Sequence, residues 1–214
     1  PQTPSIIAGV ICGICVVVML PGFMIIQPNN SRVLTFFGRY AGTVISNGFY
    51  WVNPLFLKST VTLRILNLNI DPIKVNDKVG NPIMIGAVVV WRIKDTYKAS
   101  FDISGNIREF VQIQSDAALR QVAGMYAYDT NETIDKVTLR SDESGEITQR
   151  LEDELNSRLA IAGIEIVEAR INYLAYASEI ASVMLRRQQA DAIISARERI
   201  VEGAVSMVHL ALEK

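Results

Sequence analysis

Hydrophobic and polar positions divide this chain into three parts with different patterns. The first part is the run from Ile6 to Ile26, which has no charged residue and almost no polar one. As a helix, about 20 apolar residues cross a hydrocarbon layer of about 30 Å. Pro21 and Gly22 lie near its far end, where they can stop the helix after Leu20. The pattern predicts a membrane anchor over residues 1–30.

Two forms of this anchor stay open. It is either a single span or the second arm of a hairpin, because the chain begins at Pro1 without an initiator Met and a first arm is expected upstream. A secretory signal peptide fits less well, since the run exceeds a usual h-region and no A-x-A-like site follows. Arg32 and Arg39 come after the run. The positive-inside tendency then predicts a cell-membrane protein whose following domain lies on the cytoplasmic face.

The second part, residues 31–176, predicts an α+β domain with an antiparallel or mixed β-sheet and packed helices. The run Ile83 to Ile93 is apolar on both faces until Arg92, which is typical of a central strand. Other β-like segments are a hairpin over 33–45, a strand over 61–70 and a returning strand whose inner face is Val167, Ala169, Ile171 and Tyr173. Helical spacing marks 107–122, ended by Gly124, and 147–159, ended by Gly163.

The third part, Ala177 to Lys214, is about 38 residues without proline and predicts one long helix. Apolar residues at heptad spacing form a seam of Ile194, Val201, Val205, Val208 and Leu212. Farther toward the N-terminus the same register meets charged residues, so we expect the helix to pack on more than one neighbour. The chain ends inside this helix without a C-cap, which predicts a further C-terminal segment.

Composition excludes some classes of function. The chain has 21 Lys and Arg against 22 Asp and Glu, so it lacks the basic excess of a nucleic-acid-binding protein. Cys12 and Cys15 have the C-x-x-C spacing, but both lie in the apolar run, where a thiolate is desolvated. We interpret them as small apolar residues rather than a redox pair.

The sequence shows no constellation of catalytic residues. Its one histidine, His209, lies late in the long helix, and the motifs H-E-x-x-H, Walker A, G-x-G-x-x-G and G-x-S-x-G are all missing. We therefore predict no enzyme activity, no cofactor and no metal site. A membrane hydrolase whose Ser and Lys meet only in space is a remote alternative.

Two groups of residues are candidates for contacts outside the domain. Four aromatic residues fall within eight positions near the anchor and fit either the membrane interface or a β-core: Phe49, Tyr50, Trp51 and Phe56. In the long helix, arginines and carboxylates are candidates to meet across neighbouring copies. With the apolar seam, the oligomer-contact candidates are Arg186, Arg187, Asp191, Ile194, Arg197, Glu198, Val201, Val205, Val208 and Leu212.

Several stretches in order resemble the SPFH or band-seven superfamily of stomatin, prohibitin, flotillin and HflK/HflC. These stretches include QPNNSRVLTFFGRYAGTVISNGFYWVNPLF, VNDKVGNPIMIGAVVVWRIKDTYKASFDI, SDAALRQVAGMYAYD and the segment from LNSRLAIAGIEIVEARINY onward. Bacterial stomatin-like members look most similar. One departure is Ser178, where many members have proline before a glutamate.

The resemblance implies a membrane-anchored protomer that assembles into homo-oligomeric rings or cages. Such cages organise membrane microdomains and hold or restrain client membrane proteins, including ATP-dependent proteases. An alternative is a dedicated regulatory subunit of one client, either an FtsH-type protease or an ion channel. Both alternatives imply a lipid bilayer and further copies of the chain as partners, and no nucleic acid.

Overall fold

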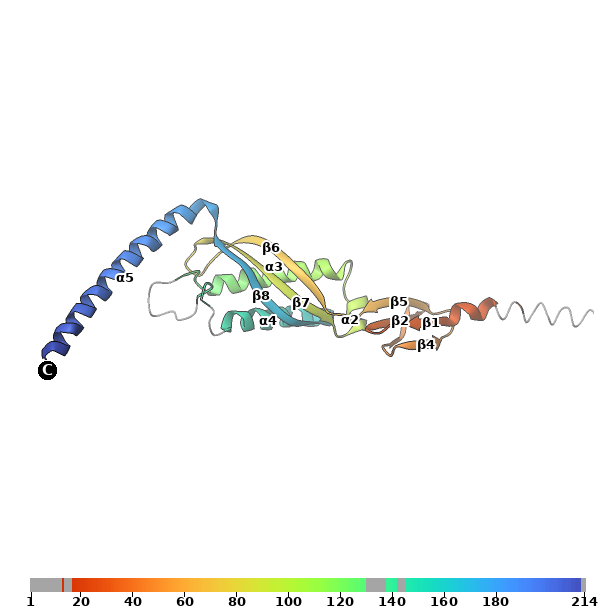
Figure 1. The fold of residues 1–214 in the computed structure, drawn as a ribbon. Coiled ribbons are helices and arrows are strands. Elements are labelled where there is room, and N and C mark those ends of the chain that lie inside the picture. The colour runs from red at the N-terminus through yellow and green to blue at the C-terminus, as the bar shows by residue number, and fades with distance from the viewer. Residues whose placement is uncertain (1–12, 14–16, 130–137, 142–144, 213–214) are drawn as a thin grey trace, which may run out of the picture. The chain divides into compact units, whose positions relative to one another are not determined.

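A computed structural model describes residues 13, 17–129, 138–141 and 145–212 (Figure 1). The predicted α+β class and the long C-terminal helix are confirmed. Ten of the 21 residues of the run from Ile6 to Ile26, including Cys12 and Cys15, lie outside the described residues. Within the described part of the chain, no helix is both long enough and apolar enough to cross a bilayer.

The chain divides into two compact units. The first unit consists of Pro1–Leu68, Val89–Ser115 and Glu152–Ala169, and the second of Asn69–Val88, Asp116–Leu151 and Arg170–Lys214. Instead of one sheet, the described strands form one two-stranded sheet and two three-stranded sheets.

The first unit opens with a short 3-10 helix, η1 (Leu20–Gly22), which leads into β1 (Phe23–Ile26). Strand β1 pairs antiparallel with β4 (Gly48–Trp51), so that Phe23 lies opposite Trp51. The last four residues of the run from Ile6 to Ile26 therefore form a strand, which agrees with a helix that stops after Leu20. Pro21 cannot continue a helix, and the β-branched Ile25 and Ile26 are favourable strand residues.

The predicted hairpin over 33–45 is confirmed. Strands β2 (Asn30–Phe36) and β3 (Arg39–Val44) pair antiparallel, and β5 (Leu57–Thr62) joins the other edge of β2. The two residues of the hairpin turn, Phe37 and Gly38, have φ angles of 44° and 81°. A turn with two positive φ values matches the right-handed twist of the strands, but for phenylalanine this conformation is unfavourable.

Strand β7 (Pro82–Ile93) is the middle strand between β6 (Leu66–Asn76) and β8 (Ile164–Tyr176), which confirms the predicted central strand. In β8 the predicted inner face is only partly right. Ile164, Ile166 and Ala169 are buried, whereas Val167 and Tyr173 are exposed. Burial changes from even to odd positions between Ile166 and Ala169, so strict alternation does not describe this long strand.

The helices α3 (Ile107–Met125) and α4 (Glu146–Leu159) confirm the two predicted helical segments. The apolar positions of α4 are almost completely buried: Ile147, Leu151, Leu155 and Leu159. Gly124 lies inside α3 and does not end it, which is a correction. Gly163 ends the helical segment as predicted, with a φ of 67° after η2 (Ala160–Ala162).

Two further helices complete the described chain. The short α2 (Thr96–Phe101) was not predicted, and it begins where the Asp95 carboxylate accepts hydrogen bonds from the backbone N–H groups of Tyr97 and Lys98. The long α5 (Ser178–Leu212) begins two residues after β8 ends and has no buried residue.

Candidate functional site

The outer face of the β1–β4 pair is apolar and exposed. Side chains alternate along both strands, so Phe23, Ile25, Phe49 and Trp51 share this outer face, and all four are about half exposed or more. The rings of Phe23 and Phe49 stack, with centroids 5.3 Å apart. Val17, Val18, Met19 and Leu20, which come just before β1, are also exposed. We call the outward side chains of β1 and β4 the aromatic face.

The opposite side of the same two strands belongs to the protein core. Met24, Ile26 and Leu34 form a buried cluster, against which Tyr50, Val52 and Phe56 pack. The four predicted interface residues thus lie in two environments. Phe49 and Trp51 point outward, and Tyr50 and Phe56 pack inward.

Backbone and side-chain contacts hold the segment before β1 against β4, Val52 and β5. The backbone N–H of Val52 donates to the carbonyl oxygen of Gly22 over 2.9 Å. The Trp51 indole N–H donates to the Met19 carbonyl over 3.3 Å, and the Lys58 ammonium donates to the Pro21 carbonyl. The approach is close at Gly22, where a Cβ atom would lie 2.6 Å from the Val52 oxygen. The apolar segment therefore joins the domain without a loose linker.

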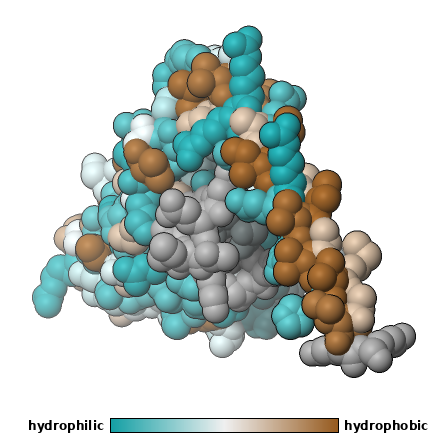
Figure 2. Space-filling model, turned by 90° about the vertical axis from the view of Figure 1, so that its left-hand side faces the viewer, coloured by the Kyte–Doolittle hydropathy of each residue, from teal (hydrophilic) through white to brown (hydrophobic). Residues whose placement is uncertain are grey.

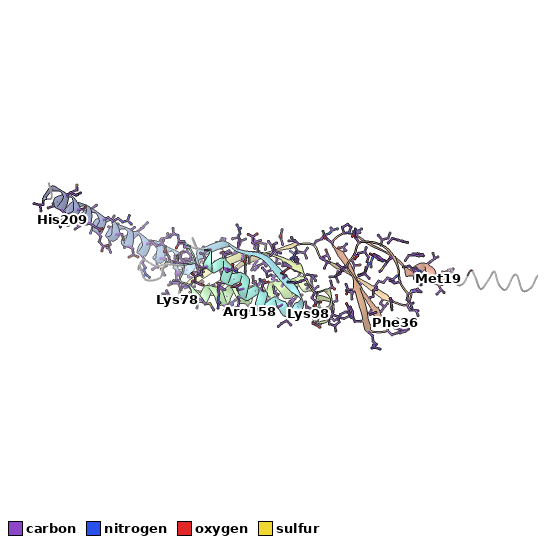
Figure 3. All side chains as sticks on the ribbon, turned by 90° about the horizontal axis from the view of Figure 1, so that it is seen from below. Met19, Phe36, Lys78, Lys98, Arg158 and His209 are labelled. Atoms are coloured by element: carbon purple, nitrogen blue, oxygen red, sulfur yellow. The ribbon has the colours of Figure 1, made fainter. Side chains whose placement is uncertain are left out.

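A second exposed apolar group lies at the tip of the β2–β3 hairpin. Phe37 is 78% exposed, and its ring contacts that of Phe36 edge-on, with ring centroids 4.8 Å apart. Leu55 and Leu57, which precede and begin β5, are exposed as well. Figure 3 labels Phe36 in this unit, together with Met19 near the described start of the chain. An exposed phenylalanine in an unfavourable backbone conformation suggests a role outside folding.

The second candidate surface is α5. Every residue from Ala192 to Leu212 is exposed, including the whole predicted apolar seam of Ile194, Val201, Val205, Val208 and Leu212. Figure 2 shows hydrophobic residues along this helix. His209 also lies near its end (Figure 3). An isolated helix with such a stripe leaves apolar surface in contact with water.

Polar contacts between described residues hold the first third of α5 to its own unit. The Lys74 ammonium lies 2.6 Å from the Glu179 carboxylate, and the Gln188 amide donates to Asp129 over 3.1 Å. Of the predicted intermolecular charges, Arg187 lies 3.8 Å from Asp191 one turn later in the same helix. The remaining charged candidates, Arg186, Arg197 and Glu198, are exposed.

Ionisable groups in the described residues form structural contacts. Hydrogen bonds from Lys94 and then Arg92 hold the pKa of the Glu165 carboxyl below its ordinary value. Burial, followed by the nearby Asp129 charge, raises the pKa of Tyr176 to about 12. The described residues contain no cluster of His, Cys, Asp and Glu that fits a metal ion.

Sequence reasoning missed three residues of these surfaces. Phe23 and Ile25 were assigned to the anchor, although Pro21 and Gly22 marked a possible end before them. Phe37 was assigned to a hairpin without attention to its turn conformation. The signal that was available for Phe37 is the Phe-Gly pair at the middle of the hairpin.

Comparison with protein families places these surfaces in context. Residues 24–204 match the family described as SPFH domain / Band 7 family. The match begins in β1 and ends within α5, so it includes most of both candidate surfaces. The search of curated proteins gave no match.

Proposed function

Because this chain belongs to the SPFH domain / Band 7 family, which is associated with membrane scaffolding, we propose that it is a membrane-anchored, oligomeric scaffold without catalytic activity. The observation that carries the proposal is the aromatic face of β1 and β4. Strand β1 is the last part of the N-terminal apolar run, so this face lies next to the proposed anchor in the sequence. In this proposal the run from Ile6 to Leu20 is the anchor.

The aromatic face would lie in the interfacial layer of the bilayer. Trp and aromatic side chains are favoured there, and moving a large apolar side chain out of water contributes about 1.5–3 kcal/mol. The outward Phe23, Ile25, Phe49 and Trp51 support this placement, while their neighbours Met24 and Tyr50 keep the strands attached to the core. The exposed Phe37 gives a second contact of the same kind.

Bilayer contact is tested by the two tryptophans, Trp51 and Trp91, in the full-length chain. Trp91→Phe leaves Trp51 as the only indole, and Trp51→Phe leaves Trp91. In nanodiscs made with brominated phosphatidylcholine, we expect strong quenching of Trp51 emission, because bromine quenches at short range. Trp91 is 2% exposed and serves as the matched control. Equal quenching of both, or none of Trp51, contradicts the proposal.

Assembly would use α5, which would pack against α5 of further copies of this chain. The length of exposed helix supports this, since all 21 residues from Ala192 to Leu212 are exposed in the described part of the chain. The heptad spacing of the apolar seam is the spacing that helices use to pack side by side. Rings or cages of such copies would mark off membrane patches and hold or restrain client membrane proteins.

Sizing of the full-length chain after detergent extraction tests assembly. Val208→Asp places a charge in the seam and should reduce the particle to smaller species. Gln189→Asp adds the same charge at an exposed polar position of the same helix and should leave the size unchanged. A monomeric wild-type chain, or a Val208→Asp particle of wild-type size, contradicts assembly through α5. Cross-linking in native membranes then separates the client proposals: one stoichiometric partner indicates a dedicated regulatory subunit.

A further inference from the structure

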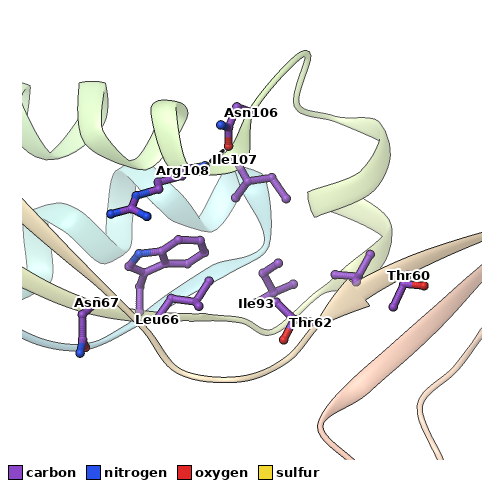
Figure 4. Close-up of a pocket in the computed structure, with 10 residues that line it drawn as sticks. Thr60, Thr62, Leu66, Asn67, Ile93, Asn106, Ile107 and Arg108 are labelled. Atoms are coloured by element: carbon purple, nitrogen blue, oxygen red, sulfur yellow. Dashed lines mark hydrogen bonds between the residues drawn. The ribbon is translucent and has the colours of Figure 1, made fainter. Parts of the chain in front are cut away.

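The first unit contains a pocket of about 280 Å³ that neither the membrane surface nor the assembly surface uses. It lies where the end of β5, the start of β6, the end of β7 and the start of α3 come together. Figure 4 shows Leu66 and Ile93 from the strands on one side of it and Ile107 and Arg108 from α3 on the other. Its volume is slightly below the usual range of ligand pockets, about 300–1,000 Å³.

The walls are mostly apolar but include one donor without an acceptor. Trp91 lines the pocket and is 2% exposed, and within the described residues its indole N–H has no hydrogen-bond partner. Buried donors in folded proteins nearly always have a partner, because an unpaired one is unfavourable. The other indole, that of Trp51, does have one. An acceptor atom of a ligand would supply the missing hydrogen-bond partner of the Trp91 indole N–H.

The α3 side of the pocket brings together a helix N-terminus and the side chain of Arg108. Helix α3 begins at Ile107, and the Asn106 side chain accepts a hydrogen bond from the backbone N–H of Arg108 over 2.9 Å. The first turn of a helix carries partial positive charge from its free N–H groups. The Arg108 guanidinium is exposed and forms no ion pair within the described part of the chain. Both features favour a ligand with an anionic group.

From the apolar walls, the unpaired indole and the cationic edge, we propose that this pocket binds a single-chain amphiphile with a carboxylate head, namely a medium-chain fatty acid. The alkyl chain would contact Leu66, Ile93 and Ile107. The carboxylate would accept from Arg108 and, with a small adjustment of the wall, from the Trp91 N–H. The small volume favours one alkyl chain over a two-chain phospholipid.

The test uses the full-length Trp51→Phe chain in nanodiscs, so that Trp91 is the only indole. Titration with 10-bromodecanoate should quench Trp91 in a saturable way, with one site per chain. Arg108→Gln removes the cation at an exposed position and should weaken binding about tenfold, as should replacement of the probe by uncharged 10-bromodecanol. Tighter binding of 10-bromodecyl phosphate would overturn the assignment of a carboxylate head.

Partition of the probe into the bilayer is the main competing source of quenching. Ile107→Phe fills part of the pocket at a half-buried position and should abolish the saturable phase. Quenching that rises without saturation and is the same in Ile107→Phe overturns the proposal. If Ile107→Phe lowers the melting temperature, the Arg108→Gln result decides instead. The outcome is independent of the scaffold proposal, because Val208→Asp should bind the probe like wild type even if assembly is lost.

Discussion

Replacing Gly22 with alanine tests whether the close fit between the apolar segment and β4 stabilises the first unit. The added Cβ atom would lie 2.6 Å from the Val52 carbonyl oxygen and 2.5 Å from the Trp51 indole nitrogen. The Val52 oxygen belongs to the backbone, so the chain directly after β4 must shift. That shift also disturbs the 2.9 Å hydrogen bond from Val52 to Gly22.

The expected magnitude follows from three contributions. Overpacking costs about 1–3 kcal/mol, and a weakened hydrogen bond adds about 0.5–1.5 kcal/mol. Alanine also restricts the unfolded chain more than glycine does, which stabilises the folded state by about 0.4–1 kcal/mol and offsets part of this loss. The net loss of stability is about 2 kcal/mol, which for a chain of this length corresponds to a melting temperature lower by about 4–8 °C.

The assay is thermal unfolding of the full-length chain in nanodiscs, followed by tryptophan emission. Gly124→Ala is the matched control, because it adds the same methyl group inside α3, where no described atom other than the nearby helix backbone and the adjacent residues lies within 4 Å of the new Cβ. It should raise stability by about 0.5–1 kcal/mol. A Gly22→Ala melting temperature equal to or above that of wild type would refute the close-fit argument.

Three further outcomes are expected. Phe37→Asn relieves the backbone strain at position 37, since asparagine tolerates a positive φ. It should leave the melting temperature within about 3 °C of wild type despite the lost ring contact. A large decrease would show that this ring is part of the core. Glu165 has a lowered pKa, so its contribution to stability is present above the ordinary glutamate pKa and is lost as pH falls through the lowered one. Melting of Glu165→Gln should therefore depend less on pH in acid, and an unchanged acid profile would contradict this. Tyr176 has a pKa raised to about 12, so the folded state opposes its ionisation and loses stability as pH rises above the ordinary tyrosine value. Tyr176→Phe should reduce that alkaline loss, and spectrophotometric titration should find one tyrosine fewer with a high pKa.

Most regular elements could be predicted because their periodicity is local. The four leucine and isoleucine positions of α4 repeat every four residues, and β7 is apolar on both faces. The short α2 has only six residues, so it shows no clear period and is marked chiefly by its Asp95 cap. Strand β1 was hidden because hydropathy alone does not separate an apolar strand from the end of an apolar helix.

The candidate surfaces were less predictable because they depend on distant partners. Alternation along β4 already puts Phe49 and Trp51 on one side and Tyr50 on the other, but it does not say which side faces the core. That choice is made by Met24, Ile26 and Leu34 from other strands. The pocket beside Trp91 is formed by segments up to about 48 positions apart, from Thr60 to Arg108, and no local pattern records it.

The short connection at Gly22 has a mechanical consequence. Three hydrogen bonds join the segment Met19–Gly22 to β4, to Val52 directly after it and to β5, so a force applied to that segment reaches the sheets directly and is not absorbed by slack chain. Tilt of the apolar segment and tilt of the β1–β4 pair are therefore coupled. If copies assemble as proposed, each would transmit the geometry of the ring to the lipid around it, and bending of the bilayer would in turn load the sheet.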